Sequence, residues 1–178
     1  MKLFSENIED LRTLYIANLK KALDMEQKIT KALPTMIEKS TDAQLATAFR
    51  NHLEETKGHV SKVESLLRDA TGEASTATCK VIGSLVTEAE DGIKDATDPN
   101  IRDITLIAAG QQVEHHEIAV YGTLRSWAEL LGNDQAATTL ESILEQEKNA
   151  DKLLSTISDS VNTSAEKKNA FTSTAATR

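Results

Sequence analysis

The sequence contains few of the residues that interrupt helices or favour strands. Only 7 glycines and 2 prolines occur among its 178 residues, and aromatic residues make up 3%. The strong helix formers Ala, Leu, Glu and Lys are abundant, and runs of β-branched residues are scarce. These features indicate an all-α fold. The length suits one domain with a substantial core.

Other absences narrow the compartment and the partners. The single cysteine, Cys79, cannot form an internal disulfide, which favours a reducing, cytoplasmic compartment. No stretch approaches 18 consecutive apolar residues, and the segment 1–10 lacks the basic and apolar regions of a signal peptide, so we expect no membrane span. A net charge of -8 and a pI near 5.1 argue against nucleic acid and anionic membranes as partners.

Capping and stop signals predict four long helices with the apolar periodicity of core-facing elements. The predicted helices run from about Asn7 (or Ser5) to Lys39, from Thr41 to Ala70, from Pro99 to Leu131 and from Asn133 to Val161. A shorter amphipathic helix is expected in the connection 73–98. We therefore predict an antiparallel four-helix bundle over residues 1–161, with the extra helix in the crossover between the second and third long helices. The polar segment 162–178 is expected to be a disordered tail.

The apolar faces of these predicted helices carry carboxylates. Those near the centre of a face are Glu26, Glu117, Glu147 and Asp151. Those at a margin, with one histidine, are Glu55, Glu114 and His59. A buried carboxylate is costly unless it is paired, protonated or bound to a metal. No Lys or Arg occupies the centre of these faces within two turns of the acids, so salt bridges do not explain them.

Metal binding would explain this arrangement. Several unpaired carboxylates raise one another's pKa values, and divalent or trivalent cations remove that conflict. Glutamates with one histidine suit iron or manganese better than magnesium or zinc. In each predicted hairpin a lone Glu precedes a second carboxylate, by 29 residues in the first and 30 in the second, and another donor follows four positions on. The two sets are Glu26 with Glu55 and His59, and Glu117 with Glu147 and Asp151.

Other polar residues near these faces receive structural interpretations. His52 borders the core of its helix and is expected to be a surface or packing residue. His115 and His116 fall off the apolar face, so we expect them in solvent or at a subunit interface. Tyr121 lies one turn from Glu117 and could hydrogen-bond to a ligand carboxylate.

Four segments carry a resemblance to a known family. They are LYIANLKKALDMEQKITKALPTM, NHLEETKGHVSKVESLL, DITLIAAGQQVEHHEIAVYGTLRSWAELLG and LEQEKNADKLL. These segments resemble the bacterial stress-response proteins of the YciE/YciF type over roughly residues 5–160, and VEHHEIAVYGTL is the most specific part. The resemblance implies a ferritin-like bundle related to rubrerythrin, a homodimer, and no established enzymatic activity.

The resemblance also implies a set of metal ligands. The ferritin-like pattern falls on Glu26, Glu55, Glu117 and Glu147, with His59 and Asp151 in the histidine roles and Glu114 as an extra carboxylate. The usual motif is Glu-x-x-His, whereas here the two partners are four residues apart and the second is an aspartate in one helix. Both spacings keep two side chains on one helical face.

Three functions remain open from the sequence. The leading one is a stress-response protein with a dinuclear iron or manganese site that reacts with oxygen or peroxide. The second is a dimeric structural or interaction protein without catalytic activity. The third is iron storage, which needs a closed shell, and the chain lacks an apolar element after the fourth long helix to help build one. The sequence does not distinguish the first function from the second.

Overall fold

The structure, a computed structural model, describes residues 8–175. Over these residues the chain forms helices and no strands, which confirms the all-α prediction. The five helices are α1 (Leu11–Lys39), α2 (Ala43–Thr71), α3 (Lys80–Asp95), α4 (Pro99–Leu130) and α5 (Asp134–Ala175). No helix among the described residues combines the length and the apolar character needed to cross a bilayer.

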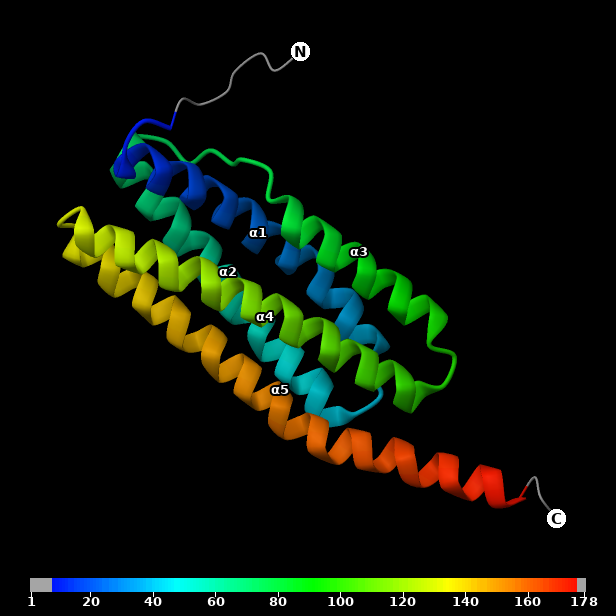
Figure 1. Ribbon diagram of the computed structural model, residues 1–178. Helices are drawn as coiled ribbons and strands as arrows, with labels where there is room; N and C mark the ends of the chain where they lie inside the picture. The colour runs from blue at the N-terminus through cyan, green and yellow to red at the C-terminus, as the bar shows by residue number, and fades with distance from the viewer. Residues whose placement is uncertain (1–7, 176–178) are drawn as a thin grey trace, which may run out of the picture.

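The four long helices lie side by side around one apolar core. Short connections join α1 to α2 and α4 to α5, and each of these pairs is in close contact. Further contacts join α2 to α5 and α1 to α4, so every long helix touches two others. The shorter α3 packs outside this group against α1 and α4 (Figure 1).

The capping signals in the sequence account for most helix ends. Asp98 begins α4, with its carboxylate accepting a hydrogen bond from the backbone N–H of Asn100 at 2.8 Å. Helix α2 ends at Gly72, whose φ of 84° is readily adopted only by glycine. Helix α1 is capped by Asp10 instead of the expected Ser5 or Asn7, which lie outside the described residues.

Helix α5 continues beyond the predicted boundary at Val161. The segment 162–175, which was expected to be disordered, is helical, and Figure 1 shows the end of α5 extending beyond the other helices. The sequence of this segment contains no Gly or Pro and includes the helix formers Ala, Glu and Lys, so no residue stops the helix. The polar character of this segment favoured disorder, but polarity alone does not end a helix.

Polar residues occupy core positions on these helices. On α1 the buried positions recur at spacings of three and four, at Tyr15, Leu19, Ala22, Glu26, Ile29, Leu33 and Met36. On α4 the same spacing runs through Gly110, Glu114, Glu117, Tyr121, Leu124 and Ala128. Glutamates therefore stand where packing alone would favour leucine. The helices also approach closely there, because a Cβ atom at Gly110 would lie 2.9 Å from Leu154 and 3.3 Å from Phe49.

Candidate metal centre

Six ionisable side chains converge between the four long helices. Helix α1 contributes one, α2 two, α4 two and α5 one. They are Glu26, His52, His59, Glu114, Glu117 and Glu147, with exposed fractions from 0% to 6%. They occupy core positions on helices whose neighbouring positions are apolar, so the packing that buries those apolar residues also buries these six.

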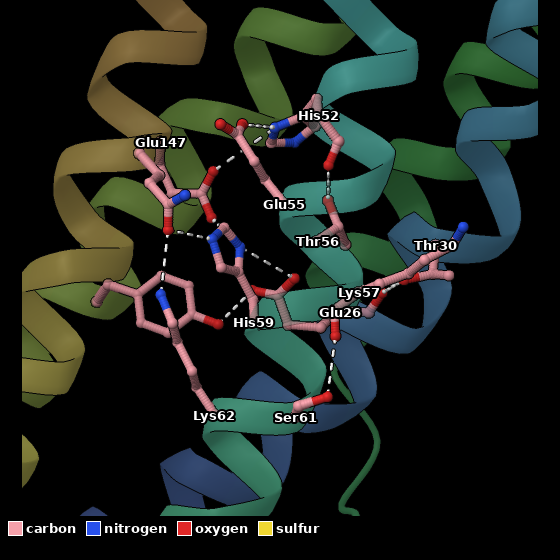
Figure 2. Close-up of polar contacts among 12 residues, drawn as sticks. Glu26, Thr30, His52, Glu55, Thr56, Lys57, His59, Ser61, Lys62 and Glu147 are labelled. Carbon is pink, nitrogen blue, oxygen red and sulfur yellow. Dashed lines mark hydrogen bonds and ion pairs between the residues drawn. The ribbon is translucent and has the colours of Figure 1, made fainter.

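A first cluster consists of Glu26, His59 and Glu147, whose ligand atoms all lie within 4.8 Å of one another. Nδ1 of His59 is 2.9 Å from Oε1 of Glu147 and 3.7 Å from Oε2 of Glu26 (Figure 2). The close pair is not aligned as a hydrogen bond, and both atoms lack a hydrogen-bond partner among the described residues. Nε2 of His59 lies 3.1 Å from the side-chain oxygen of Gln146. If Nε2 carries the proton and donates it to Gln146, Nδ1 is left free to bind a metal.

A second cluster consists of His52, Glu114, Glu117 and Glu147, again with ligand atoms within 4.8 Å of one another. Nε2 of His52 is 3.2 Å from Oε1 of Glu114, and Nδ1 is 4.0 Å from Oε2 of Glu147. Glu147 belongs to both clusters, with Oε1 facing His59 and Oε2 facing His52. A carboxylate in this position can bridge two metal ions.

The donor atoms of these residues fit a metal. Buried atoms without a hydrogen-bond partner among the described residues include both carboxylate oxygens of Glu117 and Glu147, one oxygen each of Glu26 and Glu114, both ring nitrogens of His52 and Nδ1 of His59. Orphaned buried polar atoms are rare and costly in proteins, and metal coordination would satisfy them together. A set of carboxylates and imidazoles without thiolate suits iron or manganese.

Electrostatics within the clusters reflects a shortage of positive charge. Burial, reinforced by the charges of Glu147 and Glu26, raises the pKa of Glu117 well above its ordinary value. Burial likewise raises the pKa of Glu114 to about 8. Burial by itself would lower the pKa of His52, but the carboxylates of Glu55 and Glu114, 3.8 and 3.2 Å from its ring nitrogens, outweigh burial and raise this pKa to about 9. Bound protons therefore reduce the negative charge of this cluster in the metal-free protein, as a bound cation would.

His59 follows the same rule in the first cluster. Burial lowers the pKa of His59, but the carboxylates of Glu147 and Glu26, 2.9 and 3.7 Å from Nδ1, outweigh burial and raise this pKa to about 10. A metal at Nδ1 must displace this proton, so metal binding at the centre competes with protons.

Comparison with known protein families shows which family this chain belongs to. Residues 10–166 match the family described as "Domain of unknown function (DUF892)". The chain belongs to this family. It is also 35% identical over 164 residues to Protein YciF of Escherichia coli (strain K12), a match that covers 91% of this chain and 99% of that protein. The resemblance to YciE/YciF-type proteins is thereby confirmed.

Solved structures show the same fold in this family. The E. coli stress protein YciF superposes with a TM-score of 0.84 at 32% identity, covering 88% of this chain and 99% of that one. YcfI of Rhodopseudomonas palustris, provisionally described as a structural protein, superposes with a TM-score of 0.83 at 36% identity, covering 86% of this chain and 98% of that one. A Xanthomonas campestris pv. campestris protein gives 0.74 at 22% identity, covering 90% and 99%, and shows a shared fold alone.

Five of the seven ligands predicted from the sequence of this DUF892 chain come together in the two clusters. They are Glu26, His59, Glu114, Glu117 and Glu147. Glu55 lies outside the clusters with its side chain 42% exposed, and its Oε2 is 3.8 Å from Nδ1 of His52. Asp151 is also outside, 3.5 Å from Nε2 of the exposed His115.

His52 was not among the ligands predicted from the sequence, because its position at the border of the apolar face indicated a surface or packing residue. In the structure His52 is buried and supplies the imidazole of the second cluster. A signal was present, because His52 and His59 are seven residues apart and Thr56 lies between them, so all three fall on one side of α2. The buried positions of α2 confirm that spacing, with Phe49, His52, Thr56, His59 and Val63 in sequence.

Tyr121 contacts a ligand carboxylate, as its position predicted. Its hydroxyl donates a hydrogen bond to Oε1 of Glu26, and its ring meets the ring of His59 edge-on, with centroids 6.4 Å apart. Burial, with the nearby charge of Glu26, raises the pKa of Tyr121 well above its ordinary value, so the hydroxyl keeps its proton. Tyr121 thus fixes one oxygen of Glu26 and leaves Oε2 toward His59.

Proposed function

We propose that this chain is a stress-response protein whose four long helices form a ferritin-like antiparallel bundle around two metal ions. Iron is the preferred metal and manganese is the alternative. The observation that carries the proposal is the position of Glu147, with one oxygen in each of two buried clusters of metal-type ligands. The E. coli relative that shares this fold is called a stress protein, which supports the physiological part of the proposal.

The two clusters divide the ligands between the ions. Glu26, His59 and Glu147 would hold one ion, while His52, Glu114, Glu117 and Glu147 would hold the other. A pair of divalent iron ions held by these residues would supply two electrons, the number that dioxygen and two protons need to form hydrogen peroxide, or that hydrogen peroxide and two protons need to form two waters. The protein would bind and orient the ions and exclude bulk water, and Tyr121 would keep Glu26 in position.

The positive charges of two buried histidines favour a second candidate function, that of a dimeric structural or interaction protein without catalysis. The raised pKa values of His52 and His59, at about 9 and about 10, mean that both imidazoles are protonated at neutral pH in the metal-free protein. Their positive charges offset part of the negative charge of the buried acids. The fold can then exist without metal, and the description of R. palustris YcfI agrees with such a role.

Metal titration separates the two candidates. Protein stripped of metal would be titrated anaerobically with Fe(II) and with Mn(II), with binding followed by calorimetry and the bound metal counted by elemental analysis. Two ions per chain are expected, and Glu147→Ala should lose both because Glu147 serves both clusters. Glu145→Ala, an exposed position two residues away, is the control and should bind as the parent does. If the parent protein binds no metal, or if Glu147→Ala binds as much metal as the parent, the metal-centre function is excluded and the structural or interaction role remains.

We also propose that the protein is a homodimer in the cytoplasm. The dimer rests on the family resemblance and on α3, where Val81 is 52% exposed beside the fully buried Ile82. The compartment rests on Cys79, which is a free thiol. Sedimentation at micromolar concentration should give twice the chain mass of 19.4 kDa, and a species of single-chain mass would remove the dimer.

A further inference from the structure

An apolar pocket lies beneath α3 and reaches the second cluster. Side chains of α1, α3 and α4 form most of it, and Phe49 and His52 of α2 complete it; its volume is about 40 Å³. Its apolar lining includes Ile29, Leu33, Met36, Leu85, Val86 and Val113. Thr35 and Glu90 are exposed members, whereas His52 and Glu114 are buried. The pocket therefore leads from the surface to ligands of the proposed metal centre.

The size and polarity of this pocket limit what can occupy it. A buried water needs about 10–15 Å³ of such volume, so 40 Å³ accommodates about three atoms of that size. Among the described residues that line the pocket there is no Lys or Arg, and the positive charge of His52 at its buried end already faces the carboxylate of Glu114, so the lining offers an anion no free positive partner. A hydrated cation would lose its water against an apolar wall. A small, uncharged, apolar molecule fits both limits.

A second pocket reaches the same ligand pair between α2 and α5. Its volume is about 150 Å³, and it shares Phe49, His52 and Glu114 with the first pocket. Its other lining residues include the polar side chains Asn51, Glu55, Gln146 and Asn149. A metal cation or hydrogen peroxide, which both need polar partners, is better accommodated by this polar pocket. Two approaches thus meet at His52 and Glu114, one lined almost wholly by apolar side chains and the other by a mixture of polar and apolar side chains.

We propose that dioxygen is the oxidant of this metal centre and that it reaches the centre through the apolar pocket beneath α3. This inference rests on the proposed metal-binding function and specifies its reactant. Dioxygen is uncharged, apolar and two atoms long, which matches the lining and the volume of the pocket. The buried end is lined by His52 and Glu114, and Oε2 of Glu114 and the ring nitrogens of His52 lack hydrogen-bond partners among the described residues. A molecule held there is next to the residues assigned to the second metal ion.

Xenon tests the pocket without metal, because xenon is an apolar gas that binds in dry apolar cavities. Metal-free protein would be exposed to xenon and examined by ¹²⁹Xe NMR and by crystallography under xenon pressure. We expect xenon beside Val86 and Val113 in the parent protein. Ala89→Phe, in the lining of the apolar pocket, should lose this site, whereas the matched variant Ala150→Phe, in the polar pocket, should keep it. Absence of xenon in the parent, or unchanged xenon in Ala89→Phe, would overturn the proposal.

A second measurement identifies the oxidant. Fe(II)-loaded proteins would be mixed with dioxygen or with hydrogen peroxide, and iron oxidation followed by stopped-flow absorbance. Ala89→Phe should slow oxidation by dioxygen several-fold and leave the rate with hydrogen peroxide unchanged. Ala150→Phe should leave the dioxygen rate unchanged. Equal slowing with both oxidants in Ala89→Phe, or no slowing, would refute an apolar route for dioxygen.

Two controls keep the outcomes distinct. Circular dichroism and metal stoichiometry are measured for each variant first, and Ala89→Leu, which adds less volume, replaces Ala89→Phe if the larger side chain unfolds the protein. The anaerobic titration reports on the metal centre and xenon reports on the pocket. A parent protein that binds xenon but no metal would contradict the proposed function, whereas one that binds two metals but no xenon would contradict the route alone.

Discussion

At the scale of the residue, Glu55 and Glu147 were both predicted ligands, yet their surroundings differ. The Glu55 side chain is 42% exposed in the polar pocket, whereas that of Glu147 is fully buried between two histidines. We therefore expect Glu55→Gln to bind as many ions as the parent protein, because no cluster includes Glu55. Anaerobic titration with Mn(II) would measure the stoichiometry. A loss of one ion in Glu55→Gln would show that Glu55 turns inward when metal binds.

His52 permits a sharper test of the second cluster. The first cluster does not contain His52, so His52→Ala should bind one ion per chain where the parent binds two. His115→Ala is the matched control, because His115 is exposed and contacts Asp151 outside the clusters. Elemental analysis after dialysis would give the counts. Two ions in His52→Ala would remove His52 from the ligand set.

Three of the four acids predicted near the centre of an apolar face are buried, and the fourth, Asp151, has a side chain that is 21% exposed. Glu26, Glu117 and Glu147 were correctly expected to be buried, because the apolar residues on both sides of each one pack into the core and bury it with them. His52 and Glu55 flank the face of α2, and which of them turns inward depends on how α5 and α4 pack against it. The period of one helix contains no information about that packing, so the sequence could not show that His52 is buried while the Glu55 side chain remains 42% exposed.

At the scale of the element, one buried carboxylate holds the α1–α2 connection against α4. Asp103 accepts hydrogen bonds from the backbone N–H and hydroxyl of Thr41, at 2.8 and 2.5 Å, and from the N–H of Asp42 at 2.9 Å. These contacts explain why Asp42 caps α2 in place of the predicted Thr41, whose side chain is engaged with Asp103. Long-range contacts of this kind cannot be read from local capping patterns.

Asp103→Ala should therefore destabilise the fold. Three hydrogen bonds to a charged acceptor are lost and two backbone N–H groups are left without it, so a loss of roughly 2–4 kcal/mol in the free energy of unfolding is expected. Urea denaturation followed by circular dichroism would measure it. Asp69→Ala, at an exposed position of α2, is the control and should change stability by less than about 0.5 kcal/mol. A similarly small effect for Asp103→Ala would mean that the connection is held by other contacts.

At the scale of the whole molecule, the buried acids link folding to protons and metal. The pKa of Glu114 rises from 4.5 to about 8 and that of Glu117 also rises, so the folded metal-free protein retains protons that the unfolded chain releases above about pH 4.5. Folding stability then falls as the pH increases toward 8. His52 and His59 contribute stability that is complete below their ordinary pKa of 6.5 and is lost as the pH rises through about 9 and about 10.

Metal should reverse this trend, because a bound cation replaces the protons. The Tm of the metal-free protein is expected to fall progressively from pH 5 to pH 9. The Tm of the Mn(II)-loaded protein should fall less, so the difference between the two Tm values widens as the pH rises. At neutral pH and a hundredfold excess of free metal over Kd, binding adds about 2.7 kcal/mol. Circular dichroism melts at several pH values would measure both curves, with Glu147→Ala as the variant that should show no metal-dependent difference. Coincident melting curves at pH 7, or a difference that narrows as the pH rises, would contradict a cation held by these carboxylates and imidazoles.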